Sequence, residues 1–485
     1  ENLNYYQFMR ESKLTEMVKG ISPAEFRSFG EYLNSPYHNK SRKIIQLYEL
    51  INFNYTEFDA NVITNEKIAK AIFSGEGDKD QNVRTLISSF TALLEDFLQL
   101  NELEKNKILG KTLLMKALRE RNIFKTFEMI SKEISDIQQK DFNKNSDYYY
   151  NDLKFKEIAL NYHGEDLDLD LDKSYLEMSE NTDNLFIVTK LKVLNTVISR
   201  RILSGVNIHK SYWAIDNIIS HVEKNIEMFE KDHPIIYSEF KILMMVMEPE
   251  KNKHFHDLEK HVFQNIPKYN EEELEQVYYS LSNYCVNKIA LGDDKFINEL
   301  YKIHSNFEKN GFYAKNKNLQ YTDFIGVIIC GLNMKQIKWV ESFFEAYKGN
   351  IVHEVKRDTI NLSSALIAFY HKKYKECISF LNNVGYKYTY FYLKSKETLI
   401  KAYFELGEID AMEAVIDAAK HYLKRHKQLL SIHYDRYMLF LNYVTKISRL
   451  DKKQKPELKM LMKQLDDNRT TISREWFIEK IIEMK

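Results

Sequence analysis

The chain has 485 residues and balances 70 basic against 70 acidic side chains, so its formal net charge at neutral pH is zero. A neutral chain lacks the overall positive field of a general nucleic-acid binder and the polybasic density of a membrane-surface protein. Glycine (14 residues) and proline (6 residues) are both scarce. Because both residues break helices, this composition predicts an all-α fold.

The cysteines Cys285, Cys330 and Cys377 lie far apart in the chain and form no CxxC pair. A sparse, odd-numbered set argues against a disulfide framework and for a reducing compartment, so we expect a cytoplasmic protein. No apolar run approaches the ~18 residues of a membrane span. No signal peptide is visible either.

Residues 1–105 predict an N-terminal helical bundle. The segment Ser22–Glu25 (SPAE) forms a capping box with proline at the first helical position, and Thr64 caps a later short helix. A glycine-containing loop follows at residues 74–80. The helix expected after it, over residues 80–100, carries the most regular apolar stripe in the chain.

Residues 106–260 continue as helical hairpins that begin a solenoid. Residues 113–118 and 124–137 predict a first hairpin, and a further helix ends at His163-Gly164. We interpret the acidic stretch Glu165–Asp172 as a linker before a long helix at Asn184–Leu203. Another helix is expected at Ser211–Glu230.

Residues 261–485 contain a recurring helical hairpin. Its turns are expected at Gly292, Asn333, Lys372 and Gly407, each followed by an apolar helical stripe. The turns are about 35–41 residues apart, close to the periods of two-helix repeats. A last amphipathic helix around Trp476 is expected to cap the array.

The best-formed unit, Ala402–Ala419 (AYFELGEIDAMEAVIDAA), resembles a tetratricopeptide repeat. In that family a small residue precedes a turn glycine and an aliphatic residue follows it, and Ala402, Gly407 and Ile409 fill those places. Met412 stands where the family usually has alanine. The resemblance implies a right-handed helical array that binds peptides or proteins. The whole chain also looks like a set of uncharacterised bacterial helical-repeat proteins, through its EFRSFGEYLNSPYHNK and LIKAYFELGEIDA segments.

The alternating segment 166–172 (DLDLDLD), with Ser174 and Glu177, partly matches the ligand spacing of an EF-hand calcium loop. Position six of that loop needs glycine for its sharp turn, but here it is Leu171. We therefore interpret the segment as a solvated acidic linker.

Two other partial motifs lack a required residue. The segment 110–112 (GKT) ends like a phosphate-binding loop, yet Lys105 occupies the place of the first glycine. His353 and Glu354 begin like the protease motif HExxH, but Arg357 replaces the second histidine. Neither segment predicts a nucleotide site or a protease.

His254, His256 and His261 lie close together in KHFHDLEKH. A zinc site needs its ligands on one face, and the five-residue spacing of His256 and His261 is poor for a helix. Exposed histidines beside a loop explain this cluster better, so we expect no metal and no cofactor.

Tyr386–Lys394 (YKYTYFYLK) packs five aromatic rings among lysines, which suits either the junction between two hairpins or a groove that grips a ligand. No serine, cysteine or lysine lies in a recognisable nucleophile motif, so we expect no enzyme and no catalytic residues. The residues expected to bind a partner are Tyr388, Tyr390, Tyr392, Tyr403 and Arg425.

These patterns favour a non-catalytic scaffold or adaptor that holds a peptide or protein of unknown identity in a solenoid groove. One alternative is a regulator whose helices at 64–73 and 80–100 form a helix-turn-helix that contacts nucleic acid. Acidic residues around Arg84 count against that alternative. A second alternative is a subunit of a larger assembly.

Overall fold

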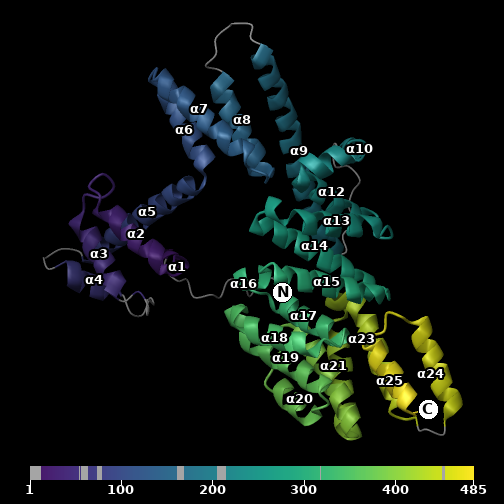
Figure 1. Ribbon diagram of the computed structural model, residues 1–485. Coiled ribbons are helices and arrows are strands. Elements are labelled where there is room, and N and C mark those ends of the chain that lie inside the picture. Colours follow the sequence, from purple (N-terminus) through teal and green to yellow (C-terminus); the bar gives the residue numbers. More distant parts are fainter. Residues whose placement is uncertain are drawn as a thin grey trace. The chain divides into compact units, whose positions relative to one another are not determined.

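The computed structural model describes residues 13–53, 55, 64–73, 79–160, 169–204, 215–316, 318–450 and 454–484. Across these ranges the regular structure is helical, with 25 α-helices, short 3₁₀ turns and no β-strand (Figure 1). An isolated bridge joins Leu319 and Ile351. The all-α fold class predicted from the sequence is confirmed.

The chain divides into two compact units. The first contains Glu1–Asp141 with Asp147–Asp183, and the second contains Phe142–Ser146 with Asn184–Lys485. This division falls inside one long helix. The three regions expected from the sequence, bounded at residues 105 and 260, stay a prediction.

The first unit begins with a small bundle whose helices bury Phe26, Phe29, Leu47, Phe90 and Leu94. The Ser22 capping box is confirmed: Ser22 Oγ accepts from the Glu25 amide at 3.2 Å, and Glu25 accepts from the Ser22 amide at 2.8 Å. The bundle consists of α1 (Lys13–Gly20), α2 (Pro23–Asn34), α3 (Arg42–Phe53), α4 (Asn65–Ile72) and α5 (Lys79–Lys105).

Three further helices share a separate core that contains Met115, Phe127 and Ile134. They are α6 (Lys107–Glu120), α7 (Phe124–Gln139) and α8 (Ser146–Leu160). The hairpin predicted from residues 113–118 and 124–137 is therefore confirmed, with Asn122 as its left-handed turn residue at φ 57°.

The next long helix starts earlier than expected, because α9 spans Leu169–Ser204. The interpretation of residues 165–172 as a linker is wrong for its last four residues, which are helical; Asp166 and Asp168 lie outside the described residues. An acidic side chain is favourable near the N-terminus of a helix, where Asp172 lies. The helix expected at Ser211–Glu230 is divided into α10 (Ile215–Lys224) and α11 (Ile226–Asp232).

The second unit stacks helical hairpins in chain order. The pairs α12/α13, α14/α15, α17/α18, α19/α20 and α21/α22 each pack together, and α17, α19 and α21 contact one another in succession (Figure 1). The helices are α12 (Pro234–Met247), α13 (Lys253–Asn265), α14 (Glu271–Ala290), α15 (Lys295–Lys309), α16 (Phe312–Lys315), α17 (Tyr321–Asn333), α18 (Ile337–Tyr347), α19 (Lys356–Tyr370), α20 (Tyr374–Leu381), α21 (Thr389–Leu406), α22 (Ile409–Arg425), α23 (Lys427–Ile447), α24 (Lys455–Asp467) and α25 (Arg474–Met484).

Four hairpins of this unit share one turn geometry. Gly292, Lys335, Lys372 and Gly407 adopt the left-handed conformation, with φ between 57° and 90°. In each turn, the amide of this residue and the amide after it donate to carbonyls in the last turn of the preceding helix. This is the Schellman ending of a helix. The second turn is centred on Lys335 and not on Asn333, because α17 continues to Asn333.

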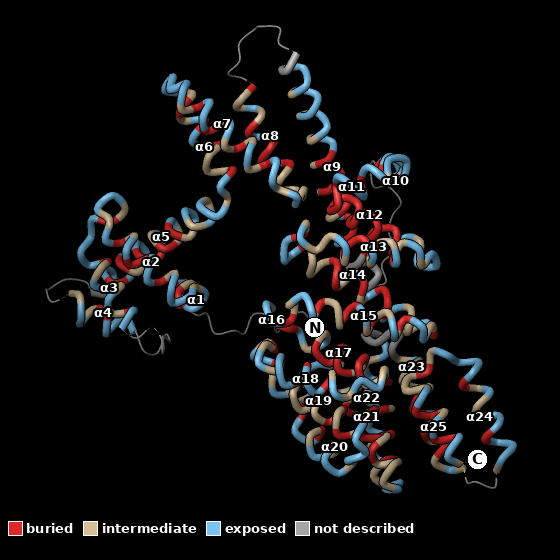
Figure 2. The backbone as a smooth tube through the Cα atoms, viewed as in Figure 1, coloured by how far each residue is buried: buried red, intermediate tan, exposed pale blue. Residues whose placement is uncertain are grey.

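Helix α12 is buried over almost its whole length (Figure 2). Its polar side chains therefore need partners inside the protein. The carboxylate of Glu239 accepts from Asn195 at 2.7 Å and from Gln276 at 3.1 Å, and Lys241 pairs with Asp257 at 2.6 Å. Burial raises the pKa of Glu239 to about 7.

Candidate functional site

The second unit contains a cleft of about 690 Å³. Leu332, Leu366 and Phe369, near the C-terminal ends of α17 and α19, supply apolar lining. One face of α21 and the segment Arg469–Lys480 supply charged lining. Helix α25 thus approaches α21 from more than 60 residues further along the chain, as the 71-residue separation of Glu405 and Trp476 shows.

The charged face of α21 consists of Lys394, Glu397, Lys401 and Glu405, which recur every three or four residues and so share one side of the helix. Glu397 is only 2% exposed. Its carboxylate accepts from Lys394 at 3.0 Å, from Lys401 at 3.5 Å and from the hydroxyl of Ser473 at 2.7 Å.

These contacts fix the charge state of Glu397. Burial alone would raise the pKa of its carboxyl group, but the two lysines and the Ser473 hydroxyl lower that pKa to about 2. The buried carboxylate is therefore ionised at neutral pH, and its charge is compensated within the protein.

Helix α25 is attached to the same face of α21 through Glu405. The indole nitrogen of Trp476 donates to Glu405 at 2.7 Å, and the ammonium group of Lys480 donates to its other oxygen at 2.9 Å. The rings of Trp476 and Phe404 are 5.2 Å apart in an edge-to-face contact. This end of the cleft is thus closed by polar and aromatic contacts together.

Three cations at the rim of the cleft differ from those inside it. Lys335, Lys372 and Arg469 are exposed, and the side chain of none of them has an ion-pair or hydrogen-bond partner among the residues that the structure describes. Among the four hairpin turns of the second unit described above, Lys335 and Lys372 are the two left-handed residues that are not glycine.

Left-handed backbone costs an L-residue about 1–2 kcal/mol. A cation at a helix C-terminus gains typically about 0.3–1 kcal/mol from the helix dipole. The helix dipole therefore offsets only part of the backbone free energy that lysine loses in the left-handed conformation at these two turns. Glycine, which Gly292 and Gly407 supply at the equivalent turns, avoids that cost.

Two of the aromatic residues predicted to bind a partner lie near each other at the start of α21. The ring of Tyr321, on α17, is 5.7 Å from the rings of both Tyr388 and Tyr390. Tyr388 is 36% exposed, and Tyr390 is half-buried.

The other three predicted residues lie elsewhere. Tyr392 stacks on Tyr422 of α22 with ring centroids 3.9 Å apart. Tyr403 packs against the core shared by α21–α25, and Arg425 is exposed at the end of α22. None of the five lines the cleft, so the five residues are not brought into one site. Their partner-binding role stays a prediction.

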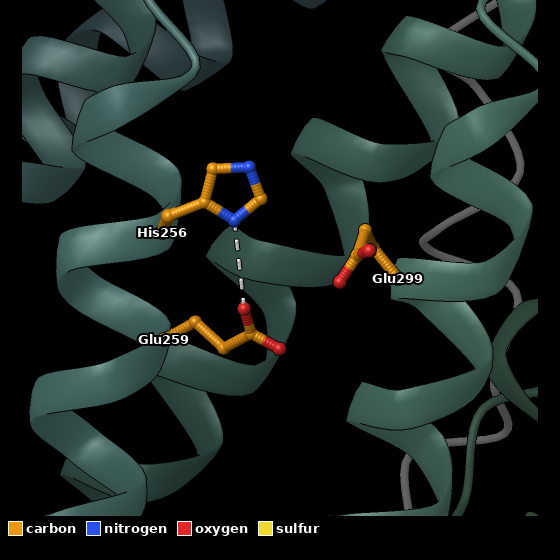
Figure 3. Close-up of side chains that lie close together, drawn as sticks. All are labelled: His256, Glu259 and Glu299. Carbon is orange, nitrogen blue, oxygen red and sulfur yellow. Dashed lines mark ion pairs between the residues drawn. The ribbon is translucent and has the colours of Figure 1, made fainter.

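The three clustered histidines separate on α13. His254 pairs with Glu248 at 2.9 Å, and His261 is buried, which lowers its pKa to about 4. His256 faces Glu259 of its own helix and Glu299 of α15 (Figure 3). Sequence reasoning named His256 but not these carboxylates, because Glu299 belongs to another hairpin.

His256, Glu259 and Glu299 place one ligand atom each within 4.8 Å of one another, a donor set that suits a divalent transition metal. Lys302, however, already binds both oxygens of Glu299, at 3.1 and 3.2 Å. Burial, and the charge of Glu299, raise the pKa of Glu259. Lys302 therefore compensates the charge of Glu299, whereas Glu259 lies partly buried beside that carboxylate.

The remaining partial motifs lie in helical backbone. Gly110, Lys111 and Thr112 are inside α6, where the Thr112 hydroxyl donates to the carbonyl of Ile108 at 2.8 Å. A phosphate-binding loop needs free amides at that place. His353 and Glu354 lie in a short 3₁₀ turn, His353–Val355.

No family model, no curated protein and no solved structure matches the chain. Among the helices that the structure describes, none is long and apolar enough to cross a membrane. The cysteines Cys285, Cys330 and Cys377 are free and buried.

Proposed function

We propose that this chain is a non-catalytic, cytoplasmic interaction scaffold, built as a divergent tetratricopeptide-like solenoid that binds a peptide or protein. The solenoid interpretation is supported by four hairpins with the same left-handed turn and the same turn hydrogen bonds. Stacked hairpins of this type build extended binding surfaces.

The observation that carries the proposal is the cleft. It combines apolar side chains from successive hairpins with exposed cations whose side chains have no ion-pair partner in the described part of the chain, in a volume of about 690 Å³. A concave surface that presents apolar and charged side chains together can hold a peptide through both kinds of contact. We therefore propose that the ligand binds in the cleft, which none of the five residues named from the sequence lines.

The non-catalytic part of the proposal is supported by how the buried ionisable groups are paired. Glu397 is held by two lysines and a hydroxyl. The buried His304 lies within 3.0 Å of the hydroxyls of Tyr278 and Tyr313. Burial lowers the pKa of His304 to about 3, so this histidine is a poor general base at neutral pH. Groups that satisfy each other in this way favour structural roles.

The test is affinity capture from native cells with the full chain as bait, at physiological salt, in nuclease-treated and untreated halves. A second bait carries Leu332→Arg in the cleft lining. A matched control bait carries Ile482→Arg, which adds the same charge at a residue that is 60% exposed and outside the cleft. Circular dichroism checks that both variants keep the helix content of the native chain.

A stoichiometric protein partner that survives nuclease, is lost with Leu332→Arg and is kept with Ile482→Arg supports the proposal. If every partner disappears with nuclease, the scaffold is wrong and a nucleic-acid-binding regulator takes its place. A partner retained equally by all three baits would move the binding surface away from the cleft.

A second candidate function, a subunit of a larger assembly, is favoured by one feature of the first unit. Leu113 and Leu114 of α6 and Met129 of α7 are 48%, 42% and 56% exposed. Exposed apolar side chains that gather on neighbouring helices mark protein contacts. Light scattering of the purified chain, compared with a Leu113→Lys/Met129→Lys variant, tests whether this surface joins copies of the chain.

A further inference from the structure

The turn lysines point to the chemistry of the ligand. We propose that the cleft binds an acidic peptide, whose carboxylates pair with Lys335, Lys372 and Arg469 at the rim. This inference rests on the proposed function and specifies its partner class.

The first step is the cost of the lysines in the folded chain. Lys335 and Lys372 occupy the left-handed turn positions of consecutive hairpins, with φ of 57° and 60°. Gly292 and Gly407 hold the equivalent positions in the flanking hairpins, so the fold accepts glycine there. A conformation that the backbone disfavours, kept at two positions on the rim of one cleft, points to a role for the side chains.

The second step is the absence of a partner within the chain. The lysines inside the cleft are neutralised, since Lys394 and Lys401 bind Glu397 and Lys480 binds Glu405. Across the described residues no carboxylate pairs with Lys335, Lys372 or Arg469. The positive charge left at the rim therefore complements an anion from outside the chain.

The third step distinguishes a peptide from a polyanion. Asp294, Glu475 and Glu479 also line the cleft, and the chain as a whole has no net charge. A nucleic acid would bring repeated phosphates against these carboxylates and gain no long-range attraction. A peptide can place one or two carboxylates at the cations and an apolar side chain against Leu332 and Phe369.

The experiment measures fluorescence anisotropy of a short labelled peptide in which glutamates flank two leucines, titrated with the full chain. The variants are Lys335→Gly, Lys372→Gly and the double substitution. Control variants Lys338→Gln and Lys375→Gln remove a charge from exposed lysines of α18 and α20, outside the cleft. Thermal unfolding is recorded for every variant.

Each turn substitution is expected to weaken peptide binding about two- to fivefold, since an exposed ion pair contributes that much. The double substitution is expected to weaken it about tenfold. The same variants should unfold a few degrees higher than the native chain, roughly 1–3 °C, because glycine relieves the turn. Loss of binding therefore cannot come from loss of folding. Both glutamine controls should bind like the native chain.

Three results would overturn the inference: equal binding by the double variant and the native chain, equal loss in the controls, or displacement of the peptide by inorganic phosphate at matched charge. If a single-stranded oligothymidylate binds more tightly than the peptide, and its binding is weakened by the same substitutions, the rim binds nucleic acid and not an acidic peptide. If a captured cellular partner needs Leu332 but not the turn lysines, the scaffold stands and this inference alone fails.

Discussion

The close approach of α17 to α18 at Gly331 gives a sharp stability prediction. Helix α17 contains Gly326 and Gly331. A Cβ atom added at Gly331 would lie 2.4 Å from Cγ2 of Val340 and 2.9 Å from the ring of Trp339, both on α18. A Cβ atom added at Gly326 would meet no atom within 4 Å. A glycine-to-alanine substitution is therefore expected to stabilise the protein at Gly326 and to destabilise it at Gly331.

The magnitudes follow from two competing effects. Alanine favours a helix over glycine by about 0.8–1 kcal/mol, so Gly326→Ala should stabilise the protein by up to that amount. At Gly331 the same gain is opposed by overpacking, which costs typically about 1–3 kcal/mol. Val340 is fully buried and β-branched, and Trp339 donates to Glu308, so neither neighbour moves freely. We expect a net loss of about 1–2 kcal/mol for Gly331→Ala.

The assay is urea unfolding of the full chain followed by tryptophan fluorescence and circular dichroism. The expected order of midpoints is Gly326→Ala, then the native chain, then Gly331→Ala. A Val340→Ala change in the Gly331→Ala background makes room for the new methyl group. The double variant should therefore lose less stability than the sum of the losses of the two single variants. If Gly331→Ala unfolds at or above the native midpoint, the close packing of α17 on α18 is refuted.

The remaining predictions concern other parts of the second unit. Gly292→Ala should lose more stability than Gly407→Ala, by about 1–2 kcal/mol, because both have positive φ but only Gly292 lies against Arg469, at 2.6 Å from the added Cβ; equal losses in thermal unfolding would contradict this. Glu239→Gln should stabilise the protein at pH 8 by roughly 2–3 kcal/mol and have little effect below pH 4.5. Its raised pKa of about 7, against 4.5 for an ordinary glutamate, gives the native fold stability at low pH that is lost as pH rises through 7; a difference that is independent of pH would argue against a buried acid. Trp476→Phe should cost about 1 kcal/mol, measured by urea unfolding, because it leaves an oxygen of Glu405 with one donor fewer; no change would mean that α25 does not depend on this bond.

Local features of the fold are predictable from the sequence because their causes lie within one helical turn. The Ser22 capping box and the buried stripe that contains Val83 and Phe90 were expected, and both are present. The turn at Gly407 was expected because glycine is the usual residue for a left-handed helix ending.

Other elements cannot be predicted from the sequence because tertiary contacts override the local preference of the residues. The turn at Lys335 has no glycine to mark it, so the sequence places it two residues too early. The start of α9 at Leu169 contradicts the acidic linker, since an acidic residue such as Asp172 suits a helix N-terminus as well as a solvated loop. The charge of a segment does not by itself distinguish a helix N-terminus from a solvated loop.

The cleft could not be predicted for a different reason. A stripe of charges at helical spacing, such as Lys394, Glu397 and Lys401, usually marks a solvated face. Here it is buried, because Ser473 reaches Glu397 from 76 residues away. Nothing in the neighbouring sequence signals a contact of that range, and only the folded arrangement makes this surface the wall of a cleft.

The aromatic segment shows how helix geometry selects among candidate residues. Successive residues of a helix turn by about 100°, so Tyr390 and Tyr392 point to nearly opposite sides of α21. Tyr392 accordingly stacks on α22, whereas Tyr390 precedes Glu397 by two turns and lies on the same side as the charged stripe. Of the two sides, the one that carries Glu397 lines the cleft, although Tyr390 itself does not reach it.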